Sequence, residues 1–147
     1  MSQVPDEYLE VLERIRPHFD RGVFAGFYIP QGWLLLVSQL NDRLEKRDPC
    51  YLLGQAKEKF GGLRYYLEVD WSRPEGLSDD EYESLMDSRW QVLEEMREIV
   101  TEYEVRSLST CQTCGDINAR PRDWGWVATL CDRCFEPLSQ RTSQAVD

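Results

Sequence analysis

Four cysteines are the residues of this chain whose type and spacing best suit chemistry. Cys111 and Cys114 form one Cys-x-x-Cys pair, and after sixteen further residues Cys131 and Cys134 form a second. Two residues between thiolates let a tight turn aim both sulfur atoms at one ion, and two such pairs complete a tetrahedron. The spacing predicts one structural zinc ion per chain. Iron is the alternative metal, and two disulfide bonds are the less favoured alternative.

The segments around these cysteines predict a small zinc-finger-like module. Gly115 suits the tight turn after the first pair, and a short helix is expected to begin at Cys131. A hairpin between the pairs would complete a treble-clef or zinc-ribbon-like arrangement over residues 109–147. Trp124 and Trp126 are expected to shield the thiolates. Four thiolates on a divalent ion leave about −2 in charge, which neighbouring Arg120 and Arg122 would balance. The alternative role for these aromatic and basic residues is to stack nucleic-acid bases.

A β-hairpin is predicted over residues 51–71. The sequence Phe60-Gly61-Gly62-Leu63 places two glycines in a two-residue turn, which sets Phe60 opposite Leu63 and Lys59 opposite Arg64. One face is then mostly apolar and packs on the core. The other face is basic, and it is either a solvated surface or a binding surface for phosphate, nucleic acid or an acidic protein. Its members are Lys57, Lys59, Arg64 and Tyr66.

Three helices are predicted from apolar residues that recur at helical spacing, over residues 6–16, 33–46 and 78–107. Ser78 and Glu81 form a capping box at the start of the last and longest helix. These elements predict an α+β fold with N-terminal helices, an antiparallel hairpin sheet and a long amphipathic helix. The expected domains are an α+β core over residues 1–108 and the zinc module over 109–147, packed on the core or appended to it.

The charge of the chain is unevenly distributed. The net charge is −10, and residues 79–104 alone hold ten acidic and two basic residues. This balance opposes non-specific nucleic-acid binding and makes the acidic helix a candidate protein-binding surface. The longest apolar run, residues 33–37, is too short to span a bilayer. The chain has four cysteines in the zinc-binding pattern and no signal peptide, so we expect a cytoplasmic protein. Cys50 is expected to be a buried apolar residue.

The residues offer little for catalysis. His18 is the single histidine, and its place at a helix end predicts a solvated or capping side chain. The chain has no phosphate-binding loop, no nucleophile elbow and no dinucleotide-binding glycine motif. We therefore do not expect an enzyme.

Three sequence segments resemble a family of small uncharacterised proteins of bacteriophages, prophages and bacterial genomes. They are Gly32-Trp33 at a helix start, the hairpin sequence QAKEKFGGLRYY over residues 55–66, and the two cysteine segments, 109–115 and 126–134. The motif Lys-Glu-Lys-Phe-Gly-Gly-Leu-Arg is the most specific of them. The resemblance covers roughly residues 25–135. It departs at residues 29–31, where the family more often has Gly-Asp or Cys-Gly-Asp.

The resemblance implies a phage or prophage setting and carries the four cysteines over as zinc ligands, but it implies no activity. The resulting hypothesis is a non-enzymatic, zinc-stabilised protein that binds a host or defence protein in the bacterial cytoplasm. The alternative hypothesis is a small nucleic-acid-binding regulator that uses the zinc module and the basic hairpin face.

Overall fold

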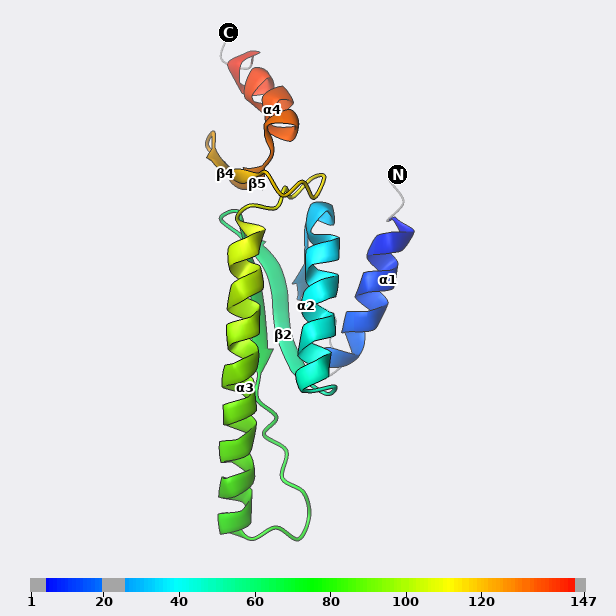
Figure 1. The fold of residues 1–147 in the computed structure, drawn as a ribbon, viewed down its shortest axis with the longest axis vertical. Coiled ribbons are helices and arrows are strands. Elements are labelled where there is room, and N and C mark those ends of the chain that lie inside the picture. The colour runs from blue at the N-terminus through cyan, green and yellow to red at the C-terminus, as the bar shows by residue number, and fades with distance from the viewer. Residues whose placement is uncertain (1–4, 20–25, 145–147) are drawn as a thin grey trace.

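The computed structural model describes residues 5–19 and 26–144, which form an α+β fold (Figure 1). Helices α2 and α3 lie side by side over one face of a three-stranded sheet, and α1 lies beside α2. A second, two-stranded sheet and α4 form the C-terminal module at the upper end of α3. The α+β prediction is confirmed. In chain order the elements are α1 Asp6–Ile15, η1 Arg16–His18, β1 Phe27–Tyr28, η3 Gln31–Trp33, α2 Leu34–Arg47, β2 Leu52–Lys59, β3 Gly62–Glu68, α3 Asp79–Ser107, β4 Arg120–Asp123, β5 Val127–Leu130 and α4 Asp132–Gln144.

The buried faces of the helices follow the predicted periodicities. The predicted stripe of α2 is buried in full, and α3 buries side chains from Met86 onward. The capping box of α3 is present, because Ser78 Oγ accepts from the Glu81 amide and the Glu81 carboxylate accepts from the Ser78 amide. The first part of α3 extends below the sheet, where the loop after β3 returns along it (Figure 1). The buried stripe of α2 comprises Trp33, Leu36, Val37, Leu40 and Leu44.

The sheet has the order β1-β2-β3, with β1 parallel to β2 and β2 antiparallel to β3. The hairpin is confirmed, but its predicted register is wrong by two residues. Lys59 pairs with Gly62, and Lys57 rather than Lys59 lies opposite Arg64. The two-residue turn therefore consists of Phe60 and Gly61, whose φ angles of 53° and 83° are both positive, as a type I′ turn requires. Phe60 is exposed, although it was predicted to face the core.

Side chains of α3 close the outer edge of β3. The Leu63 amide donates to Ser107 Oγ at 2.9 Å, and the Tyr65 amide donates to Glu104 Oε2 at 3.2 Å. Burial raises the pKa of Glu104, and the hydrogen bond from the Tyr65 amide partly opposes that rise. Two of the backbone donors that an edge strand normally leaves open are thus satisfied by side chains of α3.

His18 is buried, so the prediction of a solvated or capping histidine is wrong. Its Nδ1 lies 3.0 Å from the Tyr51 carbonyl oxygen and its Nε2 lies 2.8 Å from Glu45 Oε1. The Tyr51 carbonyl and the Glu45 carboxylate are both hydrogen-bond acceptors for the ring. The ring also stacks on Tyr51 at 3.8 Å, and the Tyr51 hydroxyl bonds to Asn41 and Tyr65. The histidine therefore belongs to a polar network inside the core.

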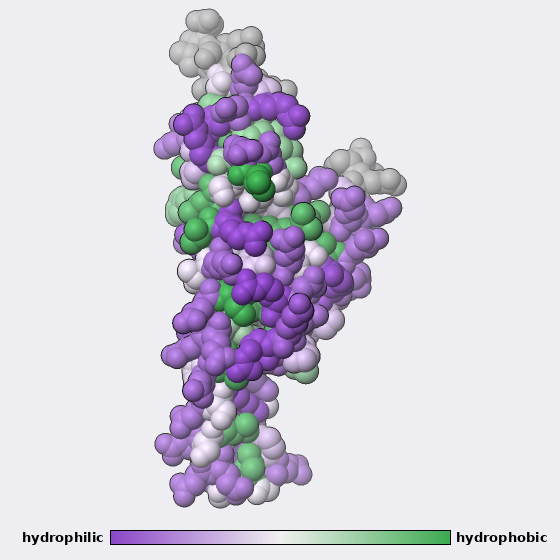
Figure 2. All heavy atoms as spheres, viewed as in Figure 1, coloured by the Kyte–Doolittle hydropathy of each residue, from purple (hydrophilic) through white to green (hydrophobic). Residues whose placement is uncertain are grey.

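Cys50 also differs from its prediction, because it is exposed and its thiol is free. It lies in the turn between α2 and β2, where its amide donates to Asp48 Oδ1 at 2.9 Å. Hydrophilic residues cover much of the face that Figure 2 shows, with hydrophobic groups in small patches. No helix in the ranges 5–19 and 26–144 is long and apolar enough to cross a membrane.

Candidate metal centre and the surfaces around it

The four predicted cysteines lie together. One ligand sulfur atom from each lies within 4.8 Å of the others, and the Cys114 and Cys131 sulfur atoms are 3.7 Å apart. A disulfide bond would require about 2.05 Å. Tetrahedral zinc–thiolate geometry with Zn–S bonds of about 2.3 Å places sulfur atoms about 3.8 Å apart. The cluster therefore fits a four-coordinate metal ion, and it is not paired as disulfides.

Two local structures aim the sulfur atoms at one point. In the first, the Gly115 amide donates to the Cys111 carbonyl at 2.9 Å, and Gly115 adopts a φ of 83°. In the second, β5 ends one residue before Cys131 and α4 begins one residue after it. The Phe135 amide then donates to the Cys131 carbonyl at 3.0 Å. The predicted order of turn, hairpin and helix is present.

The environment of the cluster favours a thiolate at Cys111 and opposes one at Cys134. Burial raises the pKa of Cys111, but backbone amides around it, led by that of Cys114, outweigh this effect and lower the pKa to about 6. Burial and hydrogen bonds with the other three thiols raise the pKa of Cys134 to about 12. In the absence of metal the cluster therefore retains protons, and a bound cation would displace them.

Arg133 is a basic residue beside the cluster that the sequence analysis did not single out. Its hydrogen bond to Cys114 and its proximity to the other thiols raise the pKa of its guanidinium. Its position inside the second Cys-x-x-Cys pair was the available indication. Arg122, by contrast, makes its contacts within the C-terminal module. It donates to the Leu130 carbonyl at 3.1 Å and to Asp132 at 2.5 Å, and its guanidinium lies 4.6 Å from the Phe135 ring. Arg120 is exposed.

The two tryptophans occupy different environments. Trp124 is partly buried against the small hydrophobic cluster of the module and meets Phe135 edge to face at 5.6 Å. Trp126 is 68% exposed. Shielding of the module therefore falls to Trp124, and the prediction of shielding by Trp126 is not supported by its position.

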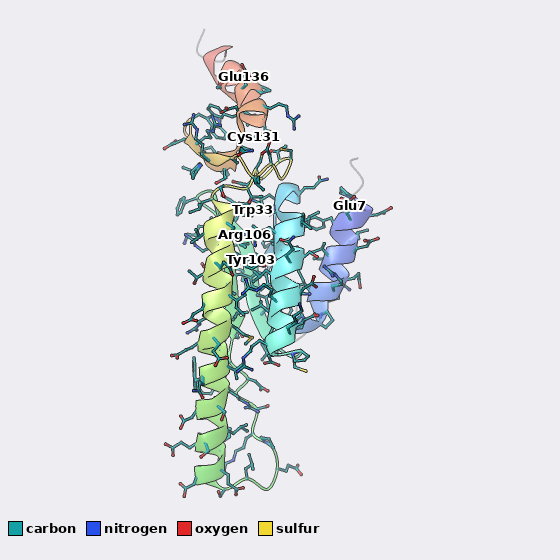
Figure 3. The ribbon with its side chains drawn as sticks, in the orientation of Figure 1. Glu7, Trp33, Tyr103, Arg106, Cys131 and Glu136 are labelled. Atoms are coloured by element: carbon teal, nitrogen blue, oxygen red, sulfur yellow. The ribbon has the colours of Figure 1, made fainter. Side chains whose placement is uncertain are left out.

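The cysteine cluster is joined to the core through the start of α2. The Trp33 indole Nε1 donates to the Thr110 carbonyl at 2.8 Å, and the Gly32 amide donates to the Gln112 carbonyl at 2.8 Å. Figure 3 shows Trp33 at this junction, below Cys131. A Cβ on Gly32 would lie 2.1 Å from the Cys111 carbonyl oxygen, so only glycine fits there. This close approach explains why Gly32-Trp33 precedes α2.

A second contact joins the module to the hairpin turn. Thr129 is fully buried, and its hydroxyl donates to the Gly61 carbonyl at 2.6 Å. The backbone amide of Gln112 in turn donates to the Thr129 carbonyl at 2.9 Å. The hairpin turn, the first cysteine pair and β5 thus meet at one place. This meeting could not be predicted from the sequence, because the segments are far apart in the chain.

The predicted basic residues lie on the open face of the sheet. Lys57 pairs with Arg64, and the Lys57 ammonium lies 5.8 Å from the Tyr66 ring. The parallel register places Tyr28 beside Lys57, so an exposed tyrosine that the sequence analysis missed joins this surface. We call the surface the basic sheet face. It comprises Tyr28, Lys57, Lys59, Arg64 and Tyr66.

Two sets of acids on α3 differ in their contacts. Glu95 and Glu102 pair with Arg47 and Arg43 of α2. Among the residues that the structure describes, a second set of acids makes no ion pair and lies along one side of the helix. Its members are Asp80, Glu83, Asp87, Glu94 and Glu98.

Comparisons of this chain with protein-family models, with curated proteins and with solved structures find no match. The resemblance to a phage and prophage family therefore stays a prediction.

Proposed function

We propose that this chain is a non-enzymatic, zinc-stabilised protein that binds another protein. The observation that carries the proposal is the contact region between the core and the cysteine cluster. There, segments that are distant in the sequence form one surface, and a metal ion bound by the four thiolates would hold that surface in place. The family resemblance supports a phage or prophage setting. In that setting the partner is a host or defence protein in the bacterial cytoplasm.

Zinc is proposed for the cluster because of its donors. Four thiolates with no histidine or carboxylate among them are typical of closed, structural zinc sites, whereas catalytic zinc keeps one position open for water. Cys111 and Cys131 are buried, and the backbone beside Cys111 is bonded to the core. Zinc would thus hold the module in one conformation, with the four cysteines as its only protein ligands.

Protein binding is supported by apolar side chains on a strongly charged surface. Scattered exposed hydrophobic residues are normal, but neighbouring ones mark contact sites. Leu35 and Ile117 are exposed on either side of the junction between core and module. A non-enzymatic role is supported by His18, whose two ring nitrogens are both engaged within the core.

Nucleic-acid binding is the second candidate, favoured by the basic sheet face. Exposed aromatic residues on an open sheet, with Lys and Arg beside them, are a platform on which unpaired bases stack. Tyr28, Tyr66 and the basic side chains beside them have this arrangement. The net charge of −10 opposes it, because the rest of the molecule repels phosphate.

Metal analysis of the purified protein tests the zinc proposal. We expect one zinc ion per chain in the wild type. Cys111→Ser and Cys131→Ser should each lose the metal and no longer show a cooperative unfolding transition. Cys50→Ser is the matched control, because that thiol is exposed and distant from the cluster, and it should retain zinc. Bound iron, or a Cys111→Ser protein that loses its metal and stays folded, would overturn the structural role.

Binding assays separate the two candidate functions. A gel-shift titration at physiological salt should show no affinity for DNA or RNA, and pulldown followed by a direct binding assay should recover a protein partner. Salt-dependent nucleic-acid binding that Lys57→Glu and Arg64→Glu abolish would instead favour the second candidate.

A further inference from the structure

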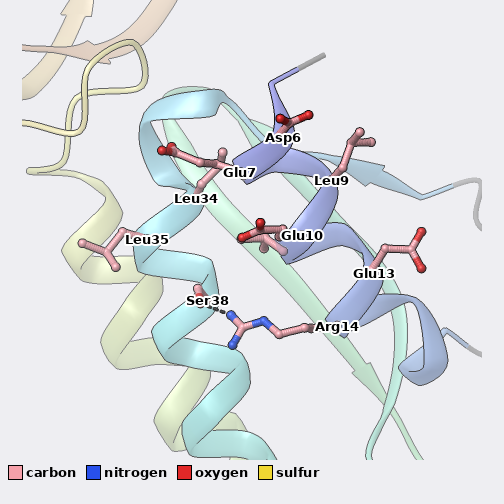
Figure 4. A pocket seen from close by; sticks show the side chains of 10 residues that line it. Asp6, Glu7, Leu9, Glu10, Glu13, Arg14, Leu34, Leu35 and Ser38 are labelled. Atoms are coloured by element: carbon pink, nitrogen blue, oxygen red, sulfur yellow. Dashed lines mark hydrogen bonds between the residues drawn. The ribbon is translucent and has the colours of Figure 1, made fainter.

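A groove crosses the junction of α1, α2 and the metal module. It consists of two hollows that share Glu7, Leu34 and Leu35. One, of about 930 Å³, lies between α1 and α2, and the other, of about 470 Å³, reaches Cys114 and Ile117. Figure 4 shows the first hollow. We call the two together the junction groove.

One side of the junction groove is apolar. Leu35 is 70% exposed and Ile117 is 76% exposed, although both are large aliphatic residues. Leu35 borders both hollows, and Ile117 belongs to the loop that follows the first cysteine pair. Figure 2 shows hydrophobic groups facing the viewer at the upper part of α2 and in the adjoining loop. Burial of two such side chains would contribute a large part of the binding free energy of a partner.

The other side of the junction groove is acidic. Glu7 and Glu10 make no ion pair among the described residues, and Figure 4 shows both side chains between α1 and α2. The one basic residue of the first hollow is Arg14, which hydrogen-bonds Ser38 and pairs with Asp42 of α2. In the second hollow, Arg106 stacks on Tyr103 at 4.6 Å. The wall formed by α1 is therefore negative, with the acids Asp6, Glu7 and Glu10 and with Glu13, which pairs with Arg16.

We propose that the junction groove binds a basic amphipathic helix of a partner protein, an inference that rests on the proposed protein-binding function. Two helices form the main walls, so they offer no unpaired strand edge, and an occupant that satisfies its own backbone fits best. An apolar stripe on that helix would cover Leu35 and Ile117. Lysines or arginines beside the stripe would face the carboxylates of α1. A second copy of this chain fits poorly, because both copies are acidic.

The metal module is part of the junction groove. The loop that carries Ile117 is fixed by the Asn118 amide, which donates to Asp116 Oδ1 at 2.8 Å, and by the Cys111 amide, which donates to the Asp116 carbonyl at 2.8 Å. These bonds belong to the turn that aims Cys111 and Cys114 at the metal. Helix binding therefore requires the metal-loaded protein.

A labelled synthetic peptide tests the proposal. The probe is a helical peptide of about 15 residues, with leucines along one face and lysines beside them. Fluorescence anisotropy at physiological salt should show binding to the zinc-loaded protein. Leu35→Gln with Ile117→Gln should weaken binding at least about tenfold, and so should Glu7→Lys with Glu10→Lys. A scrambled peptide of equal composition should bind at least about tenfold more weakly.

Matched variants on α3 control for non-specific attraction. Glu94→Lys with Glu98→Lys changes the charge equally, and Val105→Gln removes another exposed apolar residue. Both variants should bind the peptide as the wild type does, and loss of binding in Glu94→Lys with Glu98→Lys alone would assign the peptide to the acidic side of α3 and overturn the proposal. Zinc content and circular dichroism confirm that every variant is folded. Equal weakening by the groove and control variants would overturn the proposal.

An acid-flanked peptide with the same leucines separates failure of the groove from failure of the proposed function. If only that peptide binds, and Lys57→Glu with Arg64→Glu abolishes its binding, the groove proposal is wrong while protein binding stands. If neither peptide binds and the protein binds nucleic acid instead, both proposals fail. A dimer that Leu35→Gln with Ile117→Gln converts to monomer would assign the groove to a second copy and overturn the inference.

Discussion

Glu45 lies at the rim of the buried polar network, where it holds the histidine in place. Its carboxylate bonds to His18 at 2.8 Å and to the Asn41 amide at 3.1 Å. The hydrogen bond with His18 is the main cause that lowers the pKa of Glu45 below its ordinary value. A carboxyl group with a depressed pKa stabilises the fold above the pKa of the unfolded chain, about 4.3. That contribution is lost as the pH falls through the folded value.

Glu45→Gln should therefore lower stability at neutral pH and matter less in acid. The difference in unfolding free energy from the wild type is expected to be largest above about pH 5 and to shrink below about pH 4. Urea titrations of the two proteins at several pH values measure it. Acids common to both proteins cancel in the comparison, and so does loss of metal as long as both proteins still unfold cooperatively. A difference that grows as the pH falls would contradict the assigned role.

Side chains were less predictable than elements, because their partners are distant in sequence. His18 meets acceptors 27 and 33 residues away, so nothing near it indicates burial. Trp126 looked equivalent to Trp124, yet only Trp124 faces Phe135. The four cysteines were predictable because one ion imposes the same short spacing on each pair.

At the scale of elements, Ser107 connects α3 to the sheet. Its hydroxyl accepts from the Leu63 amide and donates to the Glu104 carbonyl, and the residue is fully buried. Ser107→Ala leaves that amide without a partner, so we expect a loss of about 1–3 kcal/mol in unfolding free energy. Hydrogen exchange at the Leu63 amide should also become faster.

Ser109→Ala is the control for Ser107→Ala. Ser109 is exposed, and its hydroxyl bonds only to the Arg106 carbonyl near the end of α3. This variant should remain within about 0.5 kcal/mol of the wild type. Unchanged exchange at Leu63 in Ser107→Ala would show that the hydroxyl does not hold the strand.

Elements with a clear sequence pattern were predicted, and those without one were not. The capping box and the apolar stripes gave α3 and α2 because each pattern persists over several turns. Strand β1 is two residues long and carries no alternation that could indicate it. The register error has a local cause: Phe-Gly-Gly-Leu offers two possible two-residue turns, and the structure uses the one with Phe60 at positive φ. Such a φ is unusual for phenylalanine, so the two glycines were the expected central residues of the turn.

At the scale of the whole molecule, Gly32 determines how closely core and module approach. An added Cβ would meet the carbonyl oxygen of Cys111 and the backbone of Gln112 at 2.1 and 2.6 Å, and backbone atoms cannot move aside cheaply. Gly32→Ala should therefore separate the two parts. We expect zinc affinity to fall at least about tenfold, as measured by competition with a chromophoric chelator.

Gly76→Ala provides the comparison for Gly32→Ala. Gly76 has a φ of 84°, but nothing lies within 4 Å of its added Cβ. Its replacement should reduce stability by about 1–2 kcal/mol through backbone strain and leave zinc affinity unchanged. Wild-type zinc affinity in Gly32→Ala would show that the metal site does not depend on the joint.

The closed edge of β3 also has a consequence for the protein at high concentration. An exposed strand edge is a template on which other chains add strands, and that addition leads to aggregation and fibrils. Ser107 and Glu104 occupy two of the donors that such a template would present, the amides of Leu63 and Tyr65. Partial unwinding at the C-terminal end of α3 would uncover them. The last turns of α3 therefore protect the chain against self-templating, a role that is separate from any partner it binds.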